Sequence, residues 1–246
     1  MSKGWDYENE QWTKLPTYLK HLPLFTRHYD MTSKFFRLLW AVFLKGVAYR
    51  FYIRVKIKGE FHTIAKSYPK LIVIANHASH LDATSMAAAI PFRYWPDLYI
   101  AAAKDYFFSN TVFAFFSKHC LGAIPIDRKD KKGEAIKLCL NLLTDLDRIW
   151  LIFFPEGTRS PDGAIQEFRR GISLFSEQTS TPILFLYIKG NSSLWPKGRL
   201  LPRPGALDIH IGPVCPPGPK ELIHEKYIQW VKEVDPGVDV KGPVLD

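Results

Sequence analysis

The amino-acid sequence predicts an α/β fold, with a mostly parallel or mixed central sheet flanked by helices and preceded by an N-terminal amphipathic, membrane-associated helical segment. From about residue 70 onward, apolar runs of strand length alternate with stretches of helical composition. The runs are apolar at nearly every position, which is typical of strands buried on both faces. We therefore expect two parts, membrane-associating helices over residues 1–52 and an α/β domain over residues 53–246.

Residues 16–52 predict one or two helices. The stretches LPTYLKHLPLF and SKFFRLLWAVFLKGVAYRFY carry bulky apolar residues on nearly every face, with basic residues between them. A helix packed on the domain core fits this pattern, but the abundance of aromatic side chains favours an interfacial helix pair whose basic residues meet anionic lipid. Arg37, Lys45 and Arg50 interrupt the most apolar part, residues 35–52, whereas spanning a bilayer takes ~20 mainly apolar residues.

The following elements are expected in chain order. Strands are predicted over 71–76, 98–103, 150–155, 183–190 and 207–212, with a further short strand running through Pro125. Helical composition fills the intervals 82–90, 110–120, 131–146 and 169–178, and a final helix begins near Pro219.

Charge and cysteine content restrict the class of partner and compartment. The net charge of +9 and the isoelectric point of about 9.4 favour an anionic partner, which is nucleic acid, an anionic membrane surface or a phosphorylated substrate. Cys120, Cys139 and Cys215 are widely spaced without a CxxC pair, so neither a disulfide framework nor a zinc site is expected. The N-terminal stretch lacks the basic start and apolar core of a secretory signal, which favours a cytoplasmic location.

The segment IANHASHLDA places Asn76, His77 and Asp82 directly after the first buried strand, where sites gather in open α/β sheets. A short loop and one helical turn bring the Asp82 carboxylate within reach of Nδ1 of His77, where it would fix the tautomer and stabilise the imidazolium formed when Nε2 takes a proton. The same spacing fits a helix N-cap beside a loop histidine. A metal shared with His80 is a further alternative, but no other ligand lies nearby in the sequence and no metal is expected.

Two other strand ends carry basic residues. Arg128, in GAIPIDRKDKKGE, suits a phosphate because its guanidinium can donate two hydrogen bonds to two oxygens. The alternative is a solvated charged loop. Lys104, after LYIAAA, is a secondary candidate that adds positive potential, although a solvated lysine also fits.

The segment FFPEGTRSPDG follows the most apolar strand and is the sharpest signal in the chain. A simple turn has little need of both a glutamate and an arginine. Glu156 would accept a hydrogen bond from a substrate hydroxyl or brace Arg159, and Arg159 would supply a second phosphate ligand. The turn brings these polar and turn-forming residues into one small space: Glu156, Gly157, Thr158, Arg159 and Ser160.

Together these segments resemble the glycerolipid acyltransferase family, which includes the 1-acyl-glycerol-3-phosphate (lysophosphatidic acid) acyltransferases. The blocks that carry the resemblance are NHxxxxD at Asn76, His77 and Asp82, the Gly-Ile-Arg type block GAIPIDR, the complete FPEGTRS at 154–160, and the proline-bearing TPILFLYI. They span roughly residues 71–190 in the family's order. Pro125 stands where many members carry an aromatic residue, and ILFLYI stands where IVPV is common; these departures bear on the acyl acceptor more than on the reaction.

The resemblance implies direct acyl transfer, without an acyl-enzyme, from a thioester of CoA or acyl carrier protein to the free hydroxyl of 1-acyl-glycerol-3-phosphate, giving phosphatidic acid. In that reaction His77, held by Asp82, would deprotonate the hydroxyl. Arg128 and Arg159 would hold the acceptor phosphate, and Glu156 would help to place the glycerol. Gly157 and Thr158 complete the expected acceptor site, with Asn76, Lys104 and Ser160 as secondary candidates. The thioester is a co-substrate, and no resident cofactor is expected.

The expected partners are an anionic phospholipid membrane, a lysophospholipid acceptor and the acyl thioester, and not nucleic acid. The protein would then be monotopic or peripheral, with its active site on the cytoplasmic side. Other readings remain open. The acceptor could be glycerol-3-phosphate or another lysophospholipid. A His–Asp phosphoester hydrolase would want a nucleophile or metal cluster beside His77, and a non-catalytic anionic-lipid-binding module would leave Asp82 and Glu156 unexplained.

Overall fold

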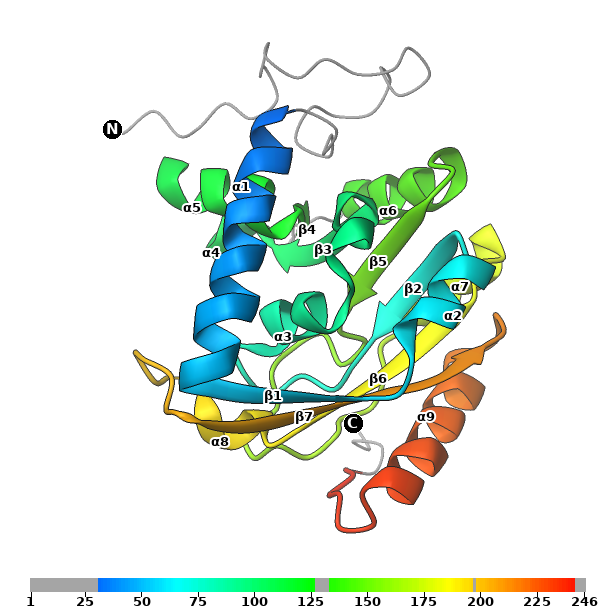
Figure 1. Cartoon of the computed structure of the whole chain (residues 1–246). Coiled ribbons are helices and arrows are strands. Elements are labelled where there is room, and N and C mark those ends of the chain that lie inside the picture. The colour runs from blue at the N-terminus through cyan, green and yellow to red at the C-terminus, as the bar shows by residue number, and fades with distance from the viewer. Residues whose placement is uncertain (1–30, 127–132, 197, 242–246) are drawn as a thin grey trace.

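The apolar runs of the sequence assemble into one seven-stranded sheet in the order β1-β7-β6-β2-β5-β3-β4 (Figure 1). The structure is a computed structural model and describes residues 31–126, 133–196 and 198–241. Neighbouring strands are parallel except for the antiparallel pair β6 and β7. The prediction of a mostly parallel or mixed sheet is therefore confirmed. The strands are β1 (Ile53–Lys58), β2 (Lys70–Ile74), β3 (Leu98–Ala103), β4 (Ala123–Ile126), β5 (Ile149–Phe153), β6 (Ile183–Lys189) and β7 (Gly205–Cys215).

Helices lie between the strands as the composition predicts. The α-helices are α1 (Met31–Phe43), α2 (Phe61–Ser67), α3 (Asp82–Ala89), α4 (Lys104–Phe107), α5 (Thr111–Phe116), α6 (Glu134–Asp145), α7 (Gly171–Thr179), α8 (Asn191–Leu194) and α9 (Lys220–Val234). The described residues also form two π-helical segments, η3 (Leu44–Tyr52) and η5 (Ser117–Leu121), and one 3-10 helix, η4 (Phe92–Asp97). Strand β1 was not predicted from the sequence, although its alternation of apolar and basic residues is typical of a strand with one exposed face, and β1 forms an edge of the sheet.

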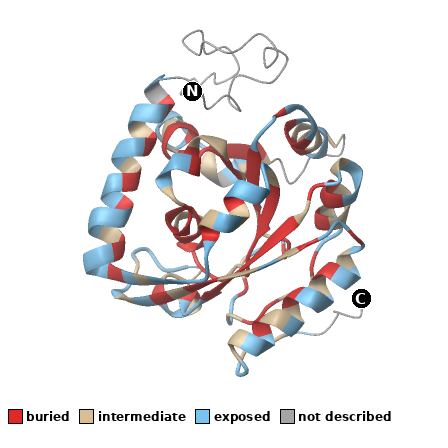
Figure 2. Cartoon of the chain, turned by 45° about the vertical axis from the view of Figure 1, so that its right-hand side comes forward, coloured by how far each residue is buried: buried red, intermediate tan, exposed pale blue. Residues whose placement is uncertain are grey.

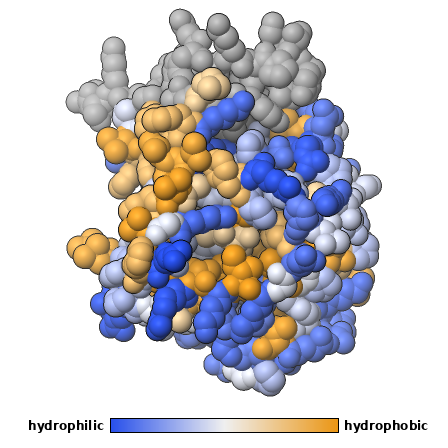
Figure 3. All heavy atoms as spheres, in the orientation of Figure 1, coloured by the Kyte–Doolittle hydropathy of each residue, from blue (hydrophilic) through white to orange (hydrophobic). Residues whose placement is uncertain are grey.

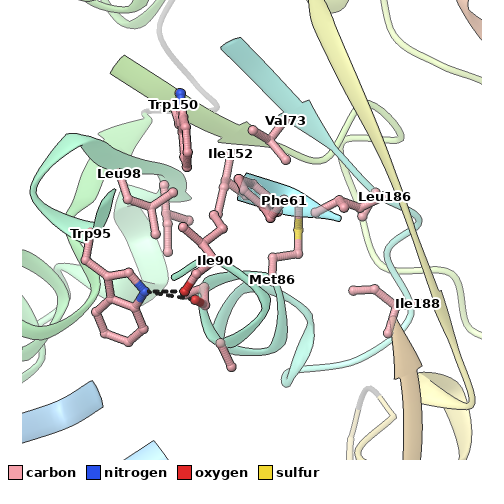
Figure 4. Packing of buried hydrophobic residues seen from close by; sticks show 14 of the residues in the cluster. Phe61, Val73, Met86, Ile90, Trp95, Leu98, Trp150, Ile152, Leu186 and Ile188 are labelled. Atoms are coloured by element: carbon pink, nitrogen blue, oxygen red, sulfur yellow. Dashed lines mark hydrogen bonds between the residues drawn. The ribbon is translucent and has the colours of Figure 1, made fainter. Parts of the chain in front are cut away.

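Each face of the sheet carries its own core. Alternate residues of β2 point to opposite faces, so Leu71 and Val73 join one core while Ile72 and Ile74 join the other. The first core is filled from α1, α2, α3 and η4, and Figure 4 shows Met86 of α3 and Ile90, the residue after α3, in one cluster with Phe61 of α2 and Trp150 of β5. The second core is filled from α6, α7 and α9. The buried residues follow the central strands in Figure 2, which leaves polar chemistry to the strand ends.

Helix α1 packs on the domain through one face and exposes the other. Ala41 of α1 and Leu44 of η3 belong to the first core, and the buried Arg37 guanidinium donates to the backbone oxygen of Trp95. The opposite face is exposed along the helix (Figure 2), and it carries large apolar side chains. Residues 1–30 of the predicted N-terminal helices lie outside the described residues. Within the described ranges, no helix combines the length and apolarity needed to cross a membrane.

The carboxyl ends of β2, β3, β4, β5 and β6 meet at one edge of the sheet, because these strands run parallel. The segments that follow them hold almost all of the residues singled out from the sequence.

Candidate active site

His77 and Asp82 face each other across the loop that follows β2. Nδ1 of His77 lies 2.8 Å from Oδ2 of Asp82, which is the first residue of α3. The imidazole stacks on the ring of Phe154, with 4.0 Å between the centroids and 17° between the planes. The His77 side chain remains partly exposed and lines a cavity, while Asp82 is fully buried.

Asp82 is held as a hydrogen-bond acceptor. Its Oδ2 also accepts from the backbone N–H groups of Ala78 and Ser79, each at 2.8 Å. Its Oδ1 accepts from Nδ2 of Asn191 at 2.8 Å. A carboxylate that already accepts several hydrogen bonds also accepts one from Nδ1–H of His77. In the neutral imidazole the proton is therefore on Nδ1, and Nε2 keeps its lone pair. This is the arrangement that a general base requires.

Sequence reasoning missed Asn191. It is buried at the start of α8, just beyond the end of β6, and it reaches Asp82 across 109 positions of the chain. Gly190, at φ +88°, makes the turn that delivers it. The available signal was the position of Gly-Asn directly after a predicted buried strand, the same place that marks His77 and Glu156.

Glu156 lies behind His77, away from the cavity lining. Its carboxylate accepts from the backbone N–H of His77 at 2.7 Å and from that of Gln166 at 3.2 Å. Burial raises the pKa of Glu156 to about 8, although these two hydrogen bonds act in the opposite direction. The sequence favoured contact with a substrate hydroxyl or with Arg159. Instead, the carboxylate accepts hydrogen bonds from two backbone N–H groups. Pro155 and Gly157 turn the chain so that this side chain points inward.

Arg159 lies on the cavity wall beside His80. Its guanidinium contacts Nε2 of that imidazole. Burial and then the positive charge of Arg159 lower the pKa of His80, because both disfavour the charged imidazolium. The backbone N–H of His80 donates to the oxygen of Trp195 at 3.1 Å, and their rings lie 5.1 Å apart.

The other predicted residues are distributed around this centre. Gly157 lines the cavity at φ +73°, and Thr158 beside it is exposed. Asn76 and Ser160 are buried and structural: Asn76 exchanges side-chain hydrogen bonds with the backbone of Ile188, and the Ser160 N–H donates to the oxygen of His77 at 2.7 Å. Lys104 is exposed outside the cavity lining. Arg128 lies outside the described residues.

The cavity has a volume of about 410 Å³ and joins the polar group to an apolar wall. His77, His80 and Arg159 lie together on its polar side. The apolar side is built from β3, β4 and the end of β5, with these residues: Ile100, Ala101, Ala102, Ala103, Ala123, Ile126, Phe153 and Phe154. The small side chains of β3 leave space that larger residues would fill. In the part of the chain that the structure describes, no three His, Cys, Asp or Glu side chains are grouped to hold a metal ion.

This geometry can be compared with known proteins. A family profile described as Acyltransferase matches residues 54–189, which contain His77, Asp82 and the whole FPEGTRS block. The chain belongs to the acyltransferase family. Asn191 lies two positions beyond the end of the match, so the family profile does not cover the partner of Asp82 Oδ1.

Two curated relatives of this acyltransferase-family chain are named as 1-acyl-sn-glycerol-3-phosphate acyltransferases. This chain is 30% identical over 177 residues to the 1-acyl-sn-glycerol-3-phosphate acyltransferase alpha of Homo sapiens, covering 70% of this chain and 59% of that protein. It is 27% identical over 159 residues to the 1-acyl-sn-glycerol-3-phosphate acyltransferase of Streptococcus pneumoniae, covering 63% of this chain and 56% of that protein. The chain thus spans less than two thirds of the length of these relatives.

A solved structure supports the fold. The crystal structure of the 1-acyl-sn-glycerophosphate (LPA) acyltransferase PlsC from Thermotoga maritima aligns with a TM-score of 0.57 at 23% identity, covering 83% of this chain and 78% of that one. The α/β architecture of this acyltransferase-family chain is therefore shared with a protein of known structure.

Proposed function

We propose that the protein transfers a fatty acyl group from a thioester of CoA or acyl carrier protein to the free hydroxyl of 1-acyl-glycerol-3-phosphate, giving phosphatidic acid. The observation that carries the proposal is the pairing of His77 with the buried Asp82 at the mouth of a cavity that is polar on one side and apolar on the other. The names of the two curated relatives support the same reaction and the same acceptor.

In the proposed reaction, Nε2 of His77 takes the proton of the acceptor hydroxyl as its oxygen attacks the thioester carbonyl carbon. The carbon–sulfur bond then breaks, and the thiolate leaves with the proton returned by the imidazolium. Asp82 stabilises the positive charge that His77 carries between these two steps. A serine nucleophile and a metal ion are not needed, because the acceptor hydroxyl is itself the nucleophile.

The polar side of the cavity binds the acceptor phosphate, and the apolar side binds the acyl chain. Arg159 offers a guanidinium to the acceptor phosphate within reach of His77, since both line the same cavity. The alanines of β3 and the phenylalanines that end β5 offer an apolar wall to an acyl chain. Glu156 fixes the backbone of His77 and so acts as a positioning residue. We further propose that the exposed apolar face of α1 and η3 holds the enzyme on the membrane that supplies its lipid substrate.

The proposal predicts that His77→Ala lowers kcat/KM for acyl transfer to lysophosphatidic acid by ~10² to 10⁴-fold, because general-base catalysis contributes that much. The measurement is release of free thiol from an acyl thioester, with circular dichroism to show that the variant is folded. His62→Ala is the matched control, since His62 lies on α2 outside the cavity lining. An active His77→Ala protein would remove His77 from the mechanism.

A second prediction concerns the acceptor phosphate. Arg159→Ala should raise the KM for lysophosphatidic acid about tenfold or more with a smaller effect on kcat, because a charge-assisted hydrogen bond to phosphate is lost on binding. The exposed Arg170 at the start of α7 gives the control variant Arg170→Ala. Steady-state kinetics over a panel of lysophosphatidic acid, glycerol-3-phosphate and lysophosphatidylcholine would also identify the acceptor. An unchanged acceptor KM would rule out the phosphate-holding role.

A further inference from the structure

The loop that leads into β7 holds two adjacent leucines in water. Leu200 is 87% exposed and Leu201 is 68% exposed. Single exposed leucines are ordinary on protein surfaces, but two neighbouring ones at a protruding turn indicate a contact surface. In Figure 3 an apolar protrusion stands at the left edge of the molecule, where Figure 1 places this loop.

Hydrogen bonds hold this turn, residues 199–203, in shape. The indole Nε1 of Trp195 donates to the oxygen of Arg199 at 2.8 Å, and Nε of Arg199 donates to the oxygen of Leu201 at 3.0 Å. The hydroxyl of Tyr52 donates to the oxygen of Pro202 at 2.8 Å. The backbone of the turn is therefore fixed while its two leucine side chains point away from the protein.

The turn lies beside the N-terminal apolar face, although about 150 residues separate them in the sequence. Ile53 of β1 pairs with Gly205 of β7, which brings the end of η3 next to the turn. Phe51 of η3 is 77% exposed. The face continues along α1 and η3 through other exposed side chains: Phe35, Leu38, Leu39, Val42, Phe43 and Val47. Figure 3 shows apolar surface gathered over α1 on the same side of the molecule.

Charge identifies the kind of partner. The sequence has no aspartate or glutamate over residues 31–59 or 196–206. Arg50, Arg54 and Arg203 are exposed around the two leucines. An apolar tip with these exposed arginines on the segments beside it is complementary to an anionic lipid surface, whose headgroups pair with the cations while the leucines enter the acyl boundary. A second copy of this chain would bring the same cations and be repelled.

We propose that the turn at Leu200 and Leu201 is a second membrane-insertion site, which enters an anionic bilayer beside the exposed face of α1 and η3. The inference extends the membrane association proposed above to a segment of the C-terminal half. Trp195 joins the turn to the catalytic loop, because its indole donates to the Arg199 oxygen while its backbone oxygen accepts from the His80 N–H and from Oγ of Ser79 at 3.0 Å. Insertion at this point therefore holds the loop that carries His77 close to the lipid surface.

The test is co-sedimentation of the full chain with phosphatidylcholine vesicles prepared with and without phosphatidic acid. The double variant Leu200→Ser, Leu201→Ser should bind the anionic vesicles at least about tenfold more weakly, because two leucines no longer leave water. Ile136→Ser with Leu222→Ser is the control, since these apolar residues of α6 and α9 are also exposed, at 42% and 41%, but their helices pack on the other face of the sheet. Arg203→Gln should weaken binding only when phosphatidic acid is present.

A depth measurement completes the test. Leu201→Cys carrying an environment-sensitive fluorophore should shift to the blue on anionic vesicles, and Leu222→Cys should not; the native cysteines are buried and leave the labelled position selective. Equal vesicle binding by the leucine variant and the parent chain would overturn the proposal, as would an equal loss in the control pair. Acyl transfer to a short-chain, monomeric lysophosphatidic acid without vesicles should be unchanged in the leucine variant. If the parent chain and its variants bind vesicles as expected but the parent chain shows no acyl transfer, the proposed function is rejected and the membrane-insertion site is not.

Discussion

At the scale of single residues, the geometry of the His77–Asp82 pair depends on the groups that hold the two side chains in place. Oδ2 of Asp82 is bonded to the loop that carries His77, whereas Oδ1 is bonded to Asn191 on a different strand end. Asn191 thus connects the β2 end of the site to the β6 end. It does not line the cavity, so its effect on catalysis passes through Asp82.

Asn191→Ala should lower kcat about tenfold or more while leaving the acceptor KM within about twofold, because a buried carboxylate oxygen loses its donor but no substrate contact changes. Asn191→Asp should be worse, since it replaces the donor with a second negative charge. Steady-state kinetics and melting temperatures measure both variants, with the exposed Asn141→Ala as control. A change confined to KM would show that Asn191 contacts substrate instead.

At the scale of elements, the hydrophobic pattern of the sequence predicted the buried strands. It did not predict features that depend on contacts between distant segments. The continuous apolar runs that became β2, β3, β5 and β6 have no other stable place than the centre of a sheet. Edge strand β1 alternates apolar and basic residues instead of forming a continuous apolar run, and its pairing with β7 fixes its place in the sheet. The motif residues were found because strand ends are readable in sequence. The inward orientation of Glu156 and the contact of Asn191 were not, since both depend on how separate loops meet.

Helix α1 and its support at Gly122 give a test at this scale. Gly122 ends η5 at φ +68°, and a Cβ there would meet the Arg37 guanidinium and lie 2.7 Å from the backbone oxygen of Leu98. Gly122→Ala should therefore destabilise the fold by about 2 kcal/mol or more. Gly133 has φ +71° but open space around it, so Gly133→Ala should show only the cost of the backbone conformation. Chemical denaturation compares the two variants, and equal losses would disprove the steric argument.

At the scale of the whole molecule, the active site and the face proposed to meet lipid share one hydrophobic core, because α1 and η3 pack on the same core as β2 and α3. Deleting residues 31–52 would remove Ala41, Leu44 and Tyr49 from the first core along with any membrane contact. Substitutions on the exposed face are therefore the cleaner way to separate membrane binding from folding. The same coupling means that ionisation of a group buried near the site is reflected in the stability of the entire fold.

Glu156 provides that last test. Burial raises its pKa from 4.5 to about 8, so between these values the folded protein binds more protons than the unfolded chain and its stability from this group falls as pH rises. Gln at this position cannot titrate. The free energy of unfolding of Glu156→Gln relative to that of the parent protein should therefore rise by roughly 1 to 3 kcal/mol between about pH 5 and pH 8, given ~1.4 kcal/mol per pKa unit. Urea denaturation at a series of pH values measures the difference. A difference that stays constant would mean that the His77 and Gln166 N–H groups already hold the carboxylate ionised at pH 5, and that hydrogen bonding outweighs burial in this pocket.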